Sequence, residues 1–232
     1  MNKGGVYILK GLLQYSVAVM VMIIALYAGL TGCGSKSVNA ATISGMQARN
    51  DNAWNKRVID SCIHILHTGD LVLRTGIDAS SYVLSRMNLS DKTYSHCGLV
   101  IIEHGYPFVY HSIGGEDNPD ACLRRDSASF FFSPRNNFGF GIARYDMNAA
   151  QRDSMQHVVY RFYKEKRKFD LDFDLKTDDK LYCAEFVYKA LNIATKDTAY
   201  IKAISFVGHS YVGVDNLFLN RHANMICRVK FK

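Results

Sequence analysis

The chain has 232 residues, of which 48% are hydrophobic and 12% aromatic, and its formal net charge is +7. This composition supplies the core of one ordinary folded domain and excludes a disordered or collagen-like chain. The basic residues are scattered and no nucleic-acid-binding signature accompanies them, so we expect no nucleic-acid partner. The one short basic run, at residues 164–168, is typical of a solvated helix end, with contact to anionic lipid or cell-wall polymer as the alternative.

The N-terminus has the organisation of a secretory signal. Lys3 and Lys10 precede an apolar run over residues 11–30, which is followed closely by Cys33 in the sequence LTGC. A positively charged start and an apolar middle are typical of such signals. The ending resembles the bacterial lipobox, in which the Cys is diacylated on sulfur and the peptide is cut before it. We therefore expect residues 1–32 to be a lipoprotein signal peptide and Cys33 to be lipidated.

This N-terminus predicts a location at the bacterial cell envelope, with membrane lipid as a partner through acylated Cys33. The alternative is an uncleaved anchor, because the apolar run is about long enough to span a bilayer. Either arrangement leaves the lysines inside and the domain facing the periplasm or exterior. Residues 33–50 are mostly small and polar and suit a flexible tether. Residues 51–232 form the folded domain.

The cysteine count bears on both structure and chemistry. Once Cys33 is assigned to lipid, five cysteines remain, with irregular spacing and no C-x-x-C motif: Cys62, Cys97, Cys122, Cys183 and Cys227. An exported compartment permits disulfides, but an odd number leaves at least one thiol free. Cys183 is the candidate for the free thiol, and the pairing of the other four stays open.

The first part of the domain combines helical and strand patterns. We expect, in chain order, a helix over residues 51–67 capped by Asp51, a turn and strand over 69–74, a loop with a short helix over 75–91, and two strands over 94–103 and 106–113. The two strand patterns flank a Gly-bearing turn, so they predict a β-hairpin.

The second part continues the mixture. We expect a long loop over residues 114–137, a strand over 138–145, a helix from its cap at Asn148 to about 166, a strand or extended arm over 168–175, a helix that begins at Cys183, and a strand over 225–231. Because the strands cluster as a meander, the pattern predicts an α+β fold with an antiparallel sheet.

Cys183 is placed on the first turn of its predicted helix, in the sequence LYCAEFVYKAL. The unpaired N–H groups and the positive dipole end at that turn lower the pKa of a thiol. The same N–H groups can hold the oxyanion that forms when a thiolate attacks a carbonyl. Taken alone, however, a cysteine in an apolar helix is more often a structural residue.

A nucleophilic thiol needs a base, and the hairpin offers two histidines. If the hairpin turns about His104 and Gly105 with an even-numbered loop, Gly98 pairs with His111. His96 and His111 are then diagonal neighbours on one face, close enough for one imidazole to orient the other. An odd-numbered loop would place them on opposite faces.

These segments together resemble a known family. The sequences GDLV, YSHCGLV, VYHS, FD and LYCAEFV, in this order over about residues 68–194, closely resemble the YiiX/YebB-like branch of the NlpC-type cysteine peptidases. The resemblance implies a circularly permuted papain-like fold, with an antiparallel sheet or partial barrel against helices and a nucleophile at a helix N-terminus. It implies Cys183 as nucleophile, His96 as general base and then acid, and His111 as the residue that orients His96. The position of His111 is often acidic among close relatives in this family. Cys97 stands where a small aliphatic residue is common, and we expect its side chain to point away from His96 and into the packed core.

The resemblance implies a class of function that the residues by themselves do not indicate. We expect an exported, membrane-anchored cysteine hydrolase that cleaves an amide of cell-wall peptide or an ester of lipid through an acyl-enzyme. The alternatives are an acyltransferase of the lecithin-retinol type and a non-catalytic binding lipoprotein of the cell envelope. We expect no cofactor and no metal, because adjacent strand residues such as His96 and Cys97 point to opposite faces.

Overall fold

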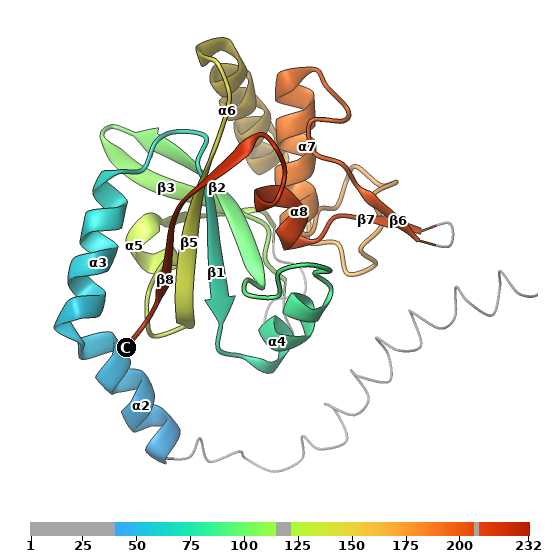
Figure 1. Ribbon diagram of the computed structural model, residues 1–232. Coiled ribbons are helices and arrows are strands. Elements are labelled where there is room, and N and C mark those ends of the chain that lie inside the picture. The colour runs from blue at the N-terminus through green and yellow to red at the C-terminus, as the bar shows by residue number, and fades with distance from the viewer. Residues whose placement is uncertain (1–39, 115–121, 207–208) are drawn as a thin grey trace, which may run out of the picture. The chain divides into compact units, whose positions relative to one another are not determined.

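The computed structural model describes residues 40–114, 122–206 and 209–232 (Figure 1). The chain divides into two compact units, Met1–Ser44 and Gly45–Lys232, and the fold described below is that of the second. The expected signal peptide and Cys33 lie outside the described residues. Within the described residues, no helix is long and apolar enough to cross a membrane.

The centre of the second unit is an antiparallel sheet with the strand order β4-β3-β2-β1-β5-β8 (Figure 1). Its strands are β1 Leu71–Gly76, β2 His96–Glu103, β3 Tyr106–His111, β4 Arg124–Ser127, β5 Asn137–Tyr145 and β8 Ala223–Lys230. A separate hairpin consists of β6 Ile204–Phe206 and β7 His209–Tyr211. The helices are α2 Ala40–Asp51, α3 Ala53–His64, α4 Ala79–Arg86, α5 Ala128–Phe131, α6 Ala149–Lys164, α7 Cys183–Thr195 and α8 Val214–Phe218.

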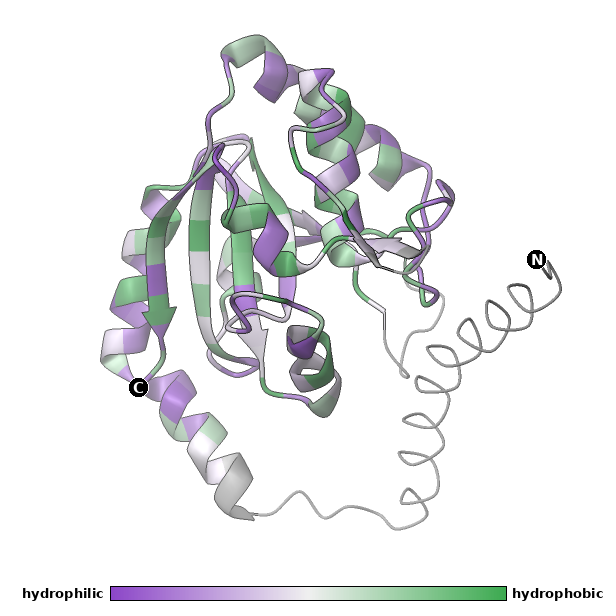
Figure 2. Ribbon diagram, turned by 45° about the vertical axis from the view of Figure 1, so that its right-hand side comes forward, coloured by the Kyte–Doolittle hydropathy of each residue, from purple (hydrophilic) through white to green (hydrophobic). Residues whose placement is uncertain are grey.

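Hydrophobic residues recur along the strands of the sheet (Figure 2), and alternation places their side chains on its two faces. On one face Leu71 and Leu99 pack with Phe186 and other residues of α6 and α7. On the other face Val72 and Val100 pack with residues of α3 and α5. The expectation of an α+β fold with an antiparallel sheet against helices is thus confirmed.

The hairpin of β2 and β3 has the register that places the two histidines on one face. Glu103 pairs with Tyr106 and Val100 with Val109. The two loop residues, His104 and Gly105, both have positive φ, at 49° and 84°. That is the requirement of a two-residue turn whose twist matches the strands, so the local chain fixes the register.

Some elements differ from expectation near the start of the domain. α3 is capped by Asn52 rather than Asp51, because the Asn52 side chain accepts hydrogen bonds from the N–H groups of Trp54 and Asn55. α2 occupies most of the segment for which we expected a flexible tether. That segment has enough helix-forming residues to continue the helical pattern up to the cap.

Two further segments differ in the second half. The expected loop over residues 114–137 contains β4 and α5. The alternating segment 168–175 forms turns instead of a regular strand, because the buried Asp170 carboxylate accepts hydrogen bonds from the N–H groups of Asp172 and Asp174. Phe173 has a φ of 52°, which interrupts an extended chain.

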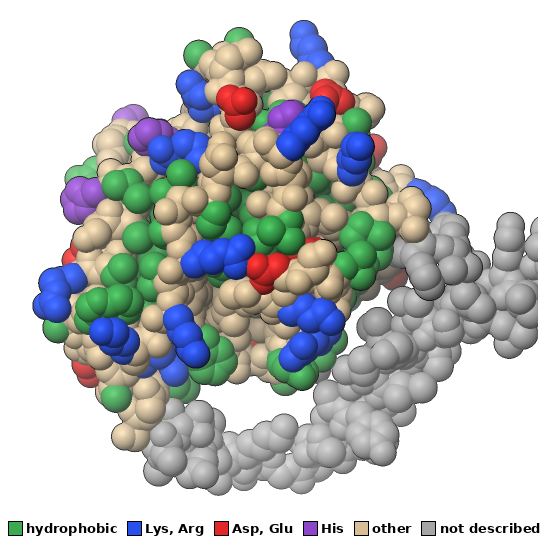
Figure 3. Space-filling model, viewed as in Figure 1, with side chains coloured by type: hydrophobic (Ala, Val, Ile, Leu, Met, Phe, Trp, Pro, Cys, Tyr) green, Lys and Arg blue, Asp and Glu red, His purple; other side chains and the backbone are tan. Residues whose placement is uncertain are grey.

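The basic side chains of the described residues are dispersed on the face that Figure 3 shows. There the Lys and Arg side chains lie among hydrophobic and neutral ones. Several are neutralised locally, for example Arg125 by Glu103 and Arg228 by Asp91. This dispersal agrees with the scattered basic residues of the sequence.

Candidate active site

Cys183 is the first residue of α7, and two contacts hold this helix end in place. The Ser112 hydroxyl, just after β3, donates a hydrogen bond of 2.5 Å to the Leu181 carbonyl. The Glu185 carboxylate accepts one of 3.2 Å from the N–H of Tyr182. Because Ser112 follows His111 directly, the start of α7 is attached to the strand that carries the second histidine.

The Cys183 thiol is stabilised as a thiolate. The largest cause is a hydrogen bond from the Cys97 thiol, which lowers the pKa of Cys183 against the opposing effect of burial. The N–H groups of Cys97 and Ala184 and the charge of Arg74 lower it further. Burial and the neighbouring Cys183 raise the pKa of Cys97 well above its usual value. Cys97 is therefore the donor and Cys183 the sulfur that ionises.

His96 and His111 lie side by side and are joined to a carboxylate. His96 Nε2 lies 2.8 Å from His111 Nδ1, and His111 Nε2 lies 3.0 Å from Asp126 Oδ2. Gly98 is required beside them, since a Cβ there would lie 2.7 Å from the Tyr110 carbonyl oxygen and 2.9 Å from His111 Cβ. The structure thus contains a hydrogen-bonded chain of two imidazoles and one carboxylate.

The charges of these three groups determine which atom donates and which accepts in each of their hydrogen bonds. Burial raises the pKa of Asp126, but hydrogen bonds from His111 and the charge of Arg124 outweigh it and the pKa lies below its usual value. Burial, followed by the charge of Arg74, lowers the pKa of His96 well below 6.5. Burial also lowers that of His111, although Asp126 opposes this shift. At neutral pH we therefore assign an ionised carboxylate and two neutral imidazoles.

With these charges only one arrangement of protons satisfies every hydrogen bond. Asp126 can only accept, so His111 donates through Nε2–H and its Nδ1 must accept. His96 then donates through Nε2–H, which leaves its Nδ1 unprotonated. Among the described residues, His96 Nδ1 has no hydrogen-bond partner. This nitrogen is the one available to act as a base.

The position of Cys183 relative to His96 follows from β2. Side chains alternate along the strand, so His96 lies against Phe131 of α5, with ring centroids 5.8 Å apart, whereas Cys97 lies on the side of α7. Cys183 accepts a hydrogen bond from the N–H of Cys97, the residue that follows His96. Within the described part of the chain, Cys183 shares no hydrogen bond with either imidazole. The structure therefore places the two histidines together and Cys183 beside the neighbouring residue of the same strand.

Arg74 is a site residue that the sequence did not suggest. It lies opposite His96 in the pairing of β1 with β2, and its guanidinium carbon is 5.2 Å from the centre of the Phe131 ring. Burial lowers its own pKa. One buried cation next to both groups favours a thiolate at Cys183 and a neutral imidazole at His96.

Asp126 and Cys97 are also part of the site, although the sequence did not indicate either role. Asp126 belongs to β4, inside the segment expected to be a loop, where it pairs with Val109. The one signal for it was the acidic residue that the resembling family often has at its third position. Cys97 does face away from His96, as expected, but its thiol lies against Cys183 as well as the core.

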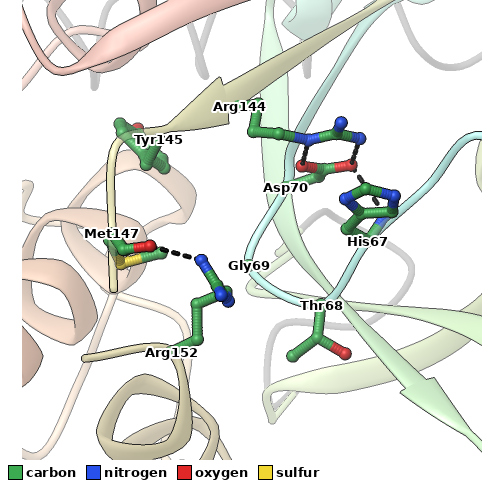
Figure 4. Close-up of a pocket in the computed structure, with 8 residues that line it drawn as sticks. All are labelled: His67, Thr68, Gly69, Asp70, Arg144, Tyr145, Met147 and Arg152. Atoms are coloured by element: carbon green, nitrogen blue, oxygen red, sulfur yellow. Dashed lines mark hydrogen bonds and ion pairs between the residues drawn. The ribbon is translucent and has the colours of Figure 1, made fainter. Parts of the chain in front are cut away.

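A pocket of about 250 Å³ lies elsewhere, where β1 begins and β5 ends (Figure 4). Arg152 stands on one side and an ion pair on the other, in which Arg144 donates two hydrogen bonds of 2.8 Å to Asp70. None of its lining residues is a predicted site residue. β1 begins with Leu71 at this pocket, and Arg74, which lies beside His96, comes farther along the strand, so the pocket and the two histidines are at different places in the fold.

Among the residues that the structure describes, no group of three or more His, Cys, Asp and Glu side chains is placed to hold a metal ion. Asp170 and Asp174, which resemble the start of a calcium loop, are joined by a hydrogen bond from the Asp174 N–H to the Asp170 carboxylate. The reactive side chains that the structure brings together at the site are thiols, imidazoles and a carboxylate.

Comparison with known proteins supports the fold. No family model matches the chain, and no curated protein matches it. A solved structure does match, that of the metalloprotein YiiX from Escherichia coli O157:H7, with 14% sequence identity and a TM-score of 0.57. The match covers 71% of this chain and 98% of that one. At this identity the likeness shows the fold alone: the chain has a YiiX-like α+β fold.

Proposed function

We propose that this protein is an exported, membrane-anchored cysteine hydrolase that cleaves an amide or an ester through an acyl-enzyme on Cys183. The YiiX-like fold supports a circularly permuted papain-like arrangement, in which histidine strands precede the cysteine helix. One observation carries the proposal. The hydrogen-bonded chain from Asp126 through His111 ends at an unprotonated Nδ1 on His96, next to the residue that Cys183 contacts.

The first step is acyl transfer to the thiol. His96 Nδ1 takes the proton of Cys183, and the thiolate attacks the carbonyl carbon of the substrate. The carbonyl oxygen gains negative charge and is held by N–H groups at the first turn of α7. The bond to the leaving amine or alcohol then breaks, and His96 returns the proton to it. The product of this step is a thioester on Cys183.

The second step resolves the thioester. His96 Nδ1 accepts a proton from water, and the resulting hydroxide attacks the thioester carbonyl. The carbon–sulfur bond breaks, the carboxylic acid leaves, and the proton on His96 returns to the Cys183 sulfur. An acyltransferase shares the first step and replaces water with another acceptor, so the two activities differ only here.

His111 and Asp126 act as positioning residues in this scheme. His111 accepts the Nε2–H of His96 and so keeps the Nδ1 of His96 unprotonated. Asp126 fixes the tautomer of His111. In hydrolases built this way the carboxylate orients the base without itself becoming protonated.

The substrate class follows from the location and not from the site. A lipid anchor at Cys33 would hold the domain within reach of both cell-wall peptide and membrane lipid. We therefore propose an amide of the former or an acyl ester of the latter. The two differ in the mass of the acyl group that is left on the enzyme.

The test is to trap and weigh that acyl group. Wild type and Cys183→Ala are incubated with cell-envelope extract, quenched in acid and digested with trypsin. We expect a mass adduct on the peptide of residues 181–189 in wild type, equal to a peptidyl or a fatty acyl group. A non-catalytic binding protein predicts no adduct on this peptide, and that outcome would refute the proposal.

A further inference from the structure

Two thiols remote from the site meet between a helix and an edge strand. Cys62 lies near the end of α3 and Cys227 lies in β8, and their sulfur atoms are 3.7 Å apart. Both belong to the apolar cluster between α3 and the sheet, which also contains Ile59, Leu66 and Val229. The two elements are therefore packed together independently of any covalent link.

We propose that Cys62 and Cys227 are an oxidation site and form a disulfide that fastens α3 to β8. A disulfide bond is about 2.05 Å long, so the two sulfurs need to approach by about 1.7 Å. Rotation about the Cα–Cβ bonds is the movement that brings the two sulfurs together. The pairing resolves two of the four cysteines that the sequence left unassigned.

The bond forms by exchange with an oxidant that is itself a disulfide, small or protein-borne. The Cys62 thiolate attacks one sulfur of the oxidant and expels the other as a thiolate. The Cys227 thiolate then attacks the Cys62 sulfur of this mixed disulfide and expels the second thiolate. The two expelled thiolates take up the protons of Cys62 and Cys227, so the oxidant leaves as two thiols.

The electrostatics of the pair suit this order of events. A hydrogen bond from Cys227 lowers the pKa of Cys62, in opposition to burial. The hydrogen bond to Cys62, together with burial, raises the pKa of Cys227. One sulfur is thus prepared as the attacking thiolate and the other holds the proton until the second step.

The proposed disulfide does not involve Cys183, the candidate nucleophile. Cys97 and Cys183 also touch each other, but they are buried on the other face of the sheet, in the cluster with α6 and α7. Cys227 is partly exposed on the edge strand. In the cell the inference rests on the proposed export, because exported compartments favour disulfides. The thiol chemistry itself does not depend on the proposed activity.

A peptide map tests the pairing. The purified full chain is incubated with oxidised glutathione, its remaining thiols are alkylated with iodoacetamide, and it is digested with trypsin. We expect residues 58–74 joined to residues 222–228, lighter by two hydrogens than their sum, and residues 181–189 alkylated. Alkylation of both Cys62 and Cys227, or a link between residues 93–124 and 181–189 in their place, would overturn the inference.

Thermal unfolding provides a readout of what the bond does. The cross-link would close a loop of 165 residues, and long loops gain most from closure. We expect reduction of the oxidised protein to lower its Tm by roughly 5–15 °C. Cys62→Ser and Cys227→Ser should each lose this response, whereas Cys122→Ser should keep it. An equal response in Cys62→Ser and wild type would contradict the pairing, whatever the outcome of the acyl-enzyme test.

Discussion

The carboxylate of Asp126 determines the tautomers of two histidines, of which the first is bonded to Asp126 and the second to the first. Of the two histidines it contacts only His111, at 3.0 Å, and His111 contacts His96 at 2.8 Å. Because each imidazole has one donor and one acceptor when neutral, the ionised end of the chain sets the free end. A residue two hydrogen bonds away thereby determines whether His96 Nδ1 can act as a base.

Asp126→Asn should therefore weaken the base without removing it. The amide can donate to His111 as well as accept, so the tautomers are no longer fixed. We expect acylation of Cys183 by p-nitrophenyl acetate to slow by roughly 10²–10⁴-fold, and 15N NMR to show a mixture of imidazole tautomers. Asp153→Asn is the matched control, since Asp153 faces His157 on the exposed side of α6. Equal rates in wild type and Asp126→Asn would argue against the positioning role.

Cys97→Ala should raise the pKa of Cys183. The substitution removes the hydrogen bond that is the largest cause of the lowered pKa, while burial, which opposes ionisation, remains. We expect alkylation of Cys183 by iodoacetamide at pH 7 to slow by about tenfold or more, because the reactive form is the thiolate. Its pH profile should move to higher pH. Cys97→Ser keeps a donor and should restore part of the rate, whereas similar profiles for both variants and wild type would contradict the assignment.

At the scale of elements, α7 contains a second unusual group. Glu185 is fully buried in the first turn, where Lys189 Nζ lies 3.0 Å from its carboxylate. Burial is the largest influence and raises the pKa of Glu185 to about 7, in spite of Lys189. The helix that presents Cys183 therefore begins with a carboxyl group that titrates near neutral pH.

Glu185→Gln should change the pH dependence of stability. In the unfolded chain the carboxyl loses its proton near pH 4.5, but in the folded protein it keeps the proton to about pH 7. Raising the pH through this window therefore favours the unfolded state. We expect the variant to gain roughly 3 kcal/mol relative to wild type between pH 4.5 and pH 8, measured by urea unfolding. Asp178→Asn, at the exposed partner of Lys189, is the control and should show no such gain.

The elements also explain what the sequence could and could not predict. The β2–β3 hairpin was predictable because a two-residue turn at His104 and Gly105 fixes its register locally. β4 was not, because its residues Arg124–Ser127 carry no apolar alternation, and its place in the sheet follows from its pairing with β3. The histidines could thus be found from the sequence, whereas Asp126 required the tertiary structure. Arg74 was missed for the same reason, since it approaches His96 through pairing with a distant strand.

At the scale of the whole molecule, the proposed anchor would determine the environment of the proposed hydrolase. The positively charged start, the apolar run and the LTGC sequence all precede the described domain. A protein held at the envelope by lipid would meet both wall peptide and lipid, and an oxidising compartment would favour the Cys62–Cys227 disulfide. These features form one consistent account of an exported hydrolase.

Cys33→Ser tests this account of the anchor. In a bacterial host that processes lipoproteins, we expect wild type to begin at Cys33 and to carry acyl groups. The variant should keep residues 1–32 and carry none, because cleavage of such signals follows acylation of the Cys. Intact-mass measurement distinguishes the two forms. Full-length, unacylated masses for both proteins, which differ only by the substitution of Cys by Ser, would favour the uncleaved anchor instead.

The most direct test of the central claim is the reactivity of Cys183 toward an electrophile, with and without its base. Wild type and His96→Ala are treated briefly with iodoacetamide at pH 7, and the labelled thiols are quantified by fragment-ion masses, because Cys97 and Cys122 share the tryptic peptide of residues 93–124. The account predicts that Cys183 reacts at least about tenfold faster than Cys122. It also predicts that this advantage falls in His96→Ala, which lacks the base, although the lowering of the Cys183 pKa by Cys97 and Arg74 remains. Equal, slow labelling of Cys183 and Cys122, unchanged by the substitution, would contradict a catalytic role for Cys183.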